Sequence, residues 1–255
     1  MKRLRRVHEP EVISEFLKNE FYQGEFHDDR AQFEKLVRDA DINNERENAL
    51  RRALLFRRRG HMWRELPADT QWWEMQFEAE DLQLIRVFPR AHWRRISNGS
   101  YQLTDITDRI RTTRFSGKTR TFISKIHSLS YHLRNERNGS SVLLIGIDET
   151  KPFTILEGNH RLAAALLVSS ELLRTHFHIF CGLSPNMAKC CWYETNFPNL
   201  WRYAQNRFHN LFYDREADVR RVLHDARPPV GSESVVPDAA LESHVDVRKA
   251  IPGSK

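Results

Sequence analysis

Five consecutive residues, Glu157 to Arg161, could carry chemistry because they combine an acid, a glycine, an amide, an imidazole and a guanidinium. An arginine can hold a phosphate through two parallel hydrogen bonds, and a histidine can donate to a phosphate or carry a proton. A glutamate can accept a proton or bind a metal ion. We therefore interpret Glu157, His160 and Arg161 as candidate catalytic residues. The structural alternative is a helix cap followed by a surface ion pair.

The secondary structure predicted around residues 157–161 would place them at the start of a helix. Two apolar runs, 142–147 and 153–156, are separated by a charged turn with a proline and predict two adjacent short strands. The Ala/Leu-rich run after Arg161 predicts a helix. A helix that starts directly after a strand leaves its first amides unpaired at the positive end of its dipole. We therefore predict a phosphate site formed by Gly158, Asn159, His160 and Arg161.

Residues 157–164, EGNHRLAA, resemble the strand-turn-helix box of the ParB/sulfiredoxin-like superfamily, which carries Gly-x-(His or Arg)-Arg followed by small residues. The resemblance implies a small α/β domain that binds a nucleotide with its phosphates on this turn. Sulfiredoxin chemistry requires a cysteine where this chain has Asn159. ParB proteins usually show a Glu-Arg-Arg or similar run after the glycine and a helix-turn-helix region downstream, and we identify neither. The kinases of free serine match best, through Glu157, His160 and Arg161.

That resemblance implies a kinase-like phosphotransferase that uses ATP or ADP with magnesium and acts on a small hydroxyl-bearing molecule. Glu157 would hold the magnesium ion or take the hydroxyl proton, and Asp148 or Glu149 on the preceding turn could do the same. The alternatives are a ParB-like, nucleotide-dependent DNA- or RNA-binding protein and a non-catalytic interaction module.

Residues 116–119, SGKT, invite comparison with a phosphate-binding P-loop, but the required earlier glycine is replaced by Thr112, so we reject that motif. The segment leads into a predicted helix over 121–134, with an amphipathic surface helix as the alternative. Further candidate ligand contacts come from this helix and from a polar break near 194–202: Lys118, Lys125, His127, Glu194, Asn196 and Arg202.

Charge suggests partners that bear phosphate, because the net charge is +6 and the pI about 9.4. Basic residues concentrate in two tracts, 51–59 and 90–120, through which nucleic acid could bind. The alternative is a solvated helix face whose arginines pair with Glu45, Glu47 or another domain. No apolar run approaches 18 residues, so we expect no membrane partner and no secretory signal. Three cysteines, two of them adjacent, favour buried thiols in a reducing cytoplasm.

The fold class we predict is α/β (α+β). Residues 1–62 form a helical N-terminal extension, with helices opened by Glu9, by Asp28 or Asp29, and by Asn44. Residues 63–183 form the ParB/sulfiredoxin-like domain with a small mixed sheet, including strands over 75–79, 82–88 and 176–183. Residues 184–214 form C-terminal helices, one over 184–191 and one over 200–211, and residues 215–255 form a flexible tail.

Overall fold

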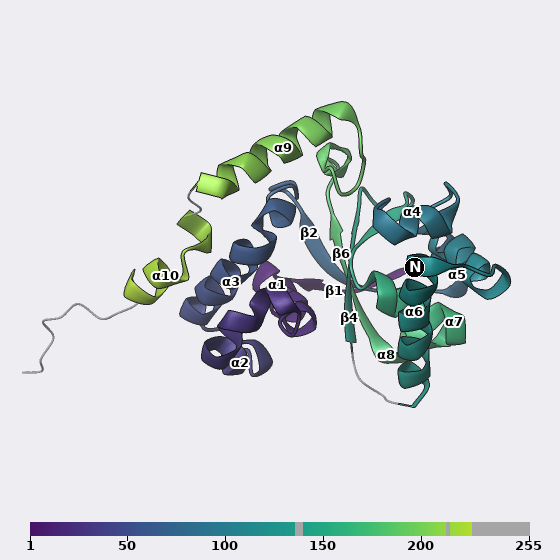
Figure 1. The fold of residues 1–255 in the computed structure, drawn as a ribbon. Helices are drawn as coiled ribbons and strands as arrows, with labels where there is room; N and C mark the ends of the chain where they lie inside the picture. Colours follow the sequence, from purple (N-terminus) through teal and green to yellow (C-terminus); the bar gives the residue numbers. More distant parts are fainter. Residues whose placement is uncertain (136–139, 213–214, 226–255) are drawn as a thin grey trace, which may run out of the picture.

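The computed structural model describes residues 1–135, 140–212 and 215–225. Within these ranges the chain is an α/β protein, as predicted, with a six-stranded mixed sheet of order β1-β2-β6-β4-β5-β3. Figure 1 shows the sheet edge-on, with helices covering both of its faces. The strands are β1 (Lys2–Val7), β2 (Gln71–Gln76), β3 (Ile85–Val87), β4 (Ser140–Gly146), β5 (Phe153–Glu157) and β6 (Phe177–Leu183).

The two predicted strands around the 148–152 turn are confirmed as β4 and β5, which pair antiparallel. β4 also pairs parallel with β6, and β5 pairs parallel with the edge strand β3. β4 is apolar from Val142 to Ile145, as expected for a strand whose two faces are both covered by helices. Val142 and Leu144 enter one hydrophobic core, while Leu143 and Ile145 enter the other.

Two layers of helices complete the fold (Figure 1). One layer, packed on Leu143 and Ile145, contains α1 (Glu9–Glu20), α2 (Arg30–Arg38) and α3 (Glu45–Trp63). The other contains α4 (Ala91–Ser97), α5 (Leu103–Thr112), α6 (Gly117–Asn135), α7 (Asn159–Val168) and α8 (Glu171–His176). The three N-terminal helices were predicted, and their apolar stripes bury against the sheet. The helix predicted over 121–134 is confirmed as α6.

Several predicted elements are wrong. The N-terminal region is not purely helical, because β1 pairs antiparallel with β2 at the sheet edge. The strand expected over 75–79 begins earlier, at Gln71, and residues 79–84 form a 3₁₀ helix before the short β3. The helix expected over 184–191 is only a 3₁₀ turn, Met187–Lys189.

The C-terminal region contains α9 (Phe197–Phe212), confirming the helix predicted over 200–211, and α10 (Val219–Asp225). α10 lies in the predicted flexible tail but packs against α3, and its Val219 is buried. The remaining tail, 226–255, lies outside the described residues. Within the part of the chain described here, no helix combines the length and apolar character that a membrane crossing requires. Cys181, Cys190 and Cys191 are free and buried, as predicted, and burial raises the pKa of Cys190 to about 12.

Candidate functional site

The predicted phosphate-binding turn joins β5 to α7 through Gly158, which has a φ of 99°. A side chain here would be strained, and its Cβ would lie 2.9 Å from Cγ2 of the buried Val142. The first hydrogen bond of α7 runs from the Leu162 N–H to the Gly158 carbonyl at 2.9 Å. The N–H groups of Asn159, His160 and Arg161 therefore head the helix without a partner inside it.

This turn borders a cavity of about 1080 Å³ that lies between the two helical layers. That volume is at the upper end of the range for small-molecule sites. Aromatic and apolar side chains form much of its lining, together with several basic groups. The lining includes Phe16, Asn19, Glu20, Arg59, His61, Met62, Arg90, Trp93, Phe122, Lys125, Leu129, Trp192 and the whole stretch from Leu156 to Arg161.

Glu157 and Arg161 bind each other in this structure. One terminal nitrogen of the Arg161 guanidinium donates to Glu157 Oε2, and the other donates to Asn19 Oδ1 and to Ser140 Oγ, the latter at 2.6 Å. Asn19 in turn donates to the Ser141 carbonyl at 3.0 Å, which fixes α1 against β4. Both terminal nitrogens of Arg161 are thus engaged within the protein, and a two-pronged grip on a phosphate would have to replace these hydrogen bonds.

Burial raises the pKa of the Glu157 carboxyl, the charge of Glu20 raises it further, and the charge of Arg161 opposes the rise. Glu157 Oε2 also accepts a hydrogen bond from Asn19 at 3.3 Å. A magnesium ion held by Glu157 would have to compete with the guanidinium for the same oxygen. The residues present therefore do not fit the predicted magnesium role of Glu157.

His160 lies beside two aromatic rings, with centroid separations of 4.9 Å to Phe122 and 5.5 Å to Trp93. Its ring remains open to solvent on the cavity side. Partial burial lowers the pKa of His160, and the positive charges of Lys125, Arg90 and Arg161 lower it further. The imidazole is therefore neutral at pH 7, and the surrounding cations favour a bound anion.

Arg90 and Lys125 are the basic groups best placed to meet such an anion. Among the described residues, neither forms an ion pair with a carboxylate, whereas Arg59, which lines the cavity from α3, pairs with Glu20 at 2.9 Å. The Arg90 guanidinium lies 5.7 Å from the centre of the Trp192 ring. Lys125 was a secondary candidate from the sequence. Arg90 was noted only as part of a basic tract, since nothing in its local spacing points to the cavity.

The buried side-chain oxygen of Asn159 adds a polar group at the helix start. Asn159 Oδ1 has no hydrogen-bond partner within the described ranges. It can accept a hydrogen bond from a ligand hydroxyl or amine, or from water.

Other sequence candidates do not line this cavity. Asp148 and Glu149 occupy the turn at the opposite end of β5, where Asp148 binds Thr150 and Glu149 pairs with Arg3. Lys118 and His127 lie on α6 but do not line the cavity. The candidates from the polar break near 194–202 have structural roles. Asn196 caps α9 and binds Glu194, and Arg202 donates to the Lys189 carbonyl at 2.8 Å.

The first basic tract is largely neutralised within the fold. Arg51 is fully buried and binds Glu47, as the structural alternative expected, together with the Leu36 and Asp41 carbonyls. The arginines at 57 and 58 both reach the buried Asp29. In the second tract, six exposed basic side chains have no ion-pair partner in the ranges described, namely Arg90, Arg94, Arg95, Arg114, Lys118 and Arg120.

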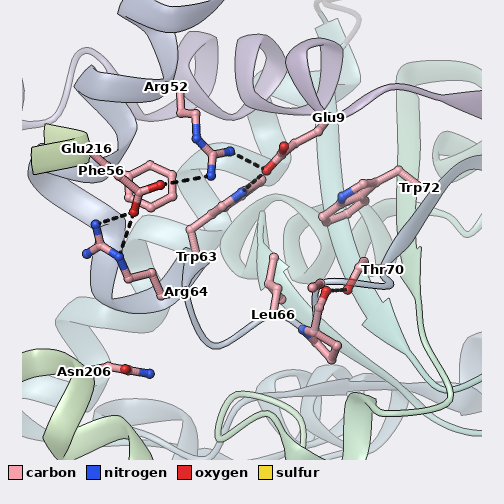
Figure 2. Close-up of a pocket in the computed structure, with 12 residues that line it drawn as sticks. Glu9, Arg52, Phe56, Trp63, Arg64, Leu66, Thr70, Trp72, Asn206 and Glu216 are labelled. Carbon is pink, nitrogen blue, oxygen red and sulfur yellow. Dashed lines mark hydrogen bonds and ion pairs between the residues drawn. The ribbon is translucent and has the colours of Figure 1, made fainter.

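A second cavity, of about 500 Å³, lies beside α3 (Figure 2). Figure 2 shows Glu216 between Arg52 and Arg64, whose guanidinium groups both lie over the Phe56 ring. Trp63 donates from Nε1 to Glu9 at 2.8 Å and stacks on Trp72. The arginines and carboxylates beside this cavity bind one another, and the ion pairs of Glu216 attach the C-terminal segment to α3.

The fold and site together define an α/β protein with a cationic, aromatic-lined cavity at the start of one helix. Searches with this chain against protein-family models, curated proteins and solved structures return no match.

Proposed function

We propose that the protein binds a nucleotide in the cavity and transfers its terminal phosphoryl group to a small hydroxyl-bearing molecule. The observation that carries the proposal is the group of Arg90, Lys125 and neutral His160 beside the free amides of α7. Cations without carboxylate partners and helix-opening amides together suit a polyanion such as an ATP or ADP phosphate chain. The rings of Phe122, Trp93 and Trp192 offer apolar surface to the base.

In the transfer step, the acceptor hydroxyl oxygen forms a bond to the terminal phosphorus, and the bond from that phosphorus to the bridging oxygen breaks. The leaving diphosphate keeps the bonding electron pair. Glu157 takes the hydroxyl proton, and its raised pKa brings it closer to the value that suits a base at neutral pH. Lys125 and Arg90 stabilise the charge on the phosphate oxygens, a contribution that dominates phosphoryl transfer. Magnesium would travel with the nucleotide, and it supplies further charge neutralisation when bound.

The test is calorimetric titration of the full chain with ATP, ADP, CTP and GTP in the presence of magnesium. Lys125→Gln should weaken binding by about 10-fold to 100-fold, the value of one charged hydrogen bond. Lys118→Gln is the matched control, because it removes the same charge from the same helix outside the cavity. Glu157→Gln should bind nucleotide but fail to phosphorylate a hydroxyl compound. Equal binding by Lys125→Gln and Lys118→Gln would contradict the proposal.

The exposed arginines of the second basic tract favour one alternative, nucleotide-dependent binding of nucleic acid in the ParB manner. In that case, affinity for a DNA or RNA duplex should fall steeply with salt. The double variant Arg95→Gln, Arg114→Gln should reduce that slope by about two. A nucleotide response without phosphoryl transfer and with such a slope would favour this alternative over the kinase. The absence of any nucleotide binding would favour the third alternative, a non-catalytic interaction module.

A further inference from the structure

The helix α9 is docked with its polar side inward. Asn199 is buried and donates to the Ala188 carbonyl at 2.9 Å and to the Glu194 carbonyl at 2.7 Å. Asn206 donates to the buried Glu65, and Tyr203 packs edge-on against Trp192. In Figure 1, α9 runs along the outer margin of the molecule. The side of the helix turned to the protein is therefore the one that hydrogen-bonds.

The apolar side of α9 faces outward. Phe197 is 81% exposed, Trp201 61%, Phe208 59% and Leu200 45%. A fully exposed large apolar side chain has roughly 200 Å² of surface, so this stripe exposes on the order of 500 Å² per chain. The largest apolar patch on a typical single chain covers about 300–600 Å² and is often functional.

The stripe has a two-fold pattern in sequence. Taking Ala204 as the centre, apolar residues of the stripe lie four positions away on both sides, at Leu200 and Phe208. Two copies of such a helix, packed antiparallel, bring the same residues together from each side, as an isologous interface requires. The small, exposed Ala204 at the centre allows close approach of the two backbones.

We propose that the outward face of α9 is a dimer interface occupied by α9 of a second copy of this chain. Two such stripes bring about 1,000 Å² of apolar surface together, which reaches the lower bound for a specific interface. The two-fold arrangement also sets Arg207 opposite the partner's Trp201, where a cation–π contact can form. α9 contains no acidic residue to repel or pair with a partner of the same sequence.

The first test is the mass of the full chain by sedimentation velocity over a range of concentrations. We expect a species of twice the 30.2 kDa chain mass. Trp201→Ser should return the protein to the single-chain mass. The control, Tyr131→Ser, also removes an exposed aromatic side chain, 67% exposed on α6, and should remain a dimer. A single-chain mass for the unaltered protein at every concentration overturns the proposal.

The second test locates the contact by disulfide formation under mild oxidation. Ala204→Cys should cross-link two copies, because the centre of the pair brings this position close to its own mate. Phe197→Cys should not, because a residue seven positions from the centre is about 21 Å along the helix axis from its mate. The three native cysteines are buried and give little background. Equal cross-linking at both positions, or none at Ala204→Cys, overturns the two-fold arrangement.

Discussion

The Gly158→Ala substitution tests the geometry of the turn that opens α7. A non-glycine residue at a φ of 99° costs about 1–2 kcal/mol. The new Cβ would also lie 2.9 Å from Cγ2 and 3.1 Å from Cγ1 of Val142, a fully buried residue in the central strand β4. Because Val142 is β-branched and held on both sides, the overlap adds about 1–3 kcal/mol. The expected loss is therefore about 2–5 kcal/mol of unfolding free energy.

The assay is urea unfolding followed by tryptophan fluorescence, with the denaturant slope as a check that the transition is unchanged. Val142→Ala alone should cost about 2 kcal/mol through lost burial and a small cavity. In the double variant, the overlap is relieved, so the backbone strain and the cost of Val142→Ala itself remain. The two losses should then sum to at least 1 kcal/mol more than the double variant loses. Strict additivity, or a loss under about 1 kcal/mol for Gly158→Ala, would refute the described turn.

Three further predictions concern charge. His160 has a lowered pKa in the free protein and should take up a proton when an anion binds beside it, so ADP affinity should rise as pH falls from 8 to 6. Calorimetry in buffers of different ionisation enthalpy should detect this proton uptake, and His160→Asn should abolish it. Arg161→Met leaves the buried Glu157 without its cation and should cost about 3 kcal/mol. The pKa of Glu157 is raised on folding, so that loss should shrink as pH falls from 8 towards 5, and a pH-independent loss would contradict the described pair. Glu216→Ala should cost under about 1 kcal/mol in urea unfolding, because this carboxylate is nearly half exposed.

The central strands and the turn could be predicted because each is determined by a local sequence pattern. β4 and β5 contain the largely apolar runs 142–147 and 153–156, and the glycine before an Ala/Leu helix has few other interpretations. The pairing of Glu157 with Arg161 also left a signal, since the two residues are four positions apart. The sequence interpretation favoured phosphate binding by Arg161 over this ion pair.

Other features depend on partners far away in the sequence. β1 reads KRLRRV, with almost no apolar content, and only Val7 is buried; main-chain pairing with β2 holds it at the sheet edge. The cavity wall formed by Arg90, Trp93 and Phe122 arises because α4 and α6 pack together opposite the turn. For α9, periodicity identified the helix but could not tell which side faces the protein. Its polar side, which carries the buried Asn199 and the partly buried Asn206, faces the protein, whereas most surface helices turn their apolar side inward.

The most direct measurement of the central claim is a backbone amide NMR titration of the full chain with ADP. If phosphate binds the opening of α7, the amide resonances of Asn159, His160 and Arg161 should shift progressively and saturate. Those of the turn around Thr150, at the other end of β5, should stay in place. Saturable shifts confined to residues outside the cavity, or no shift at the three amides, would contradict the account.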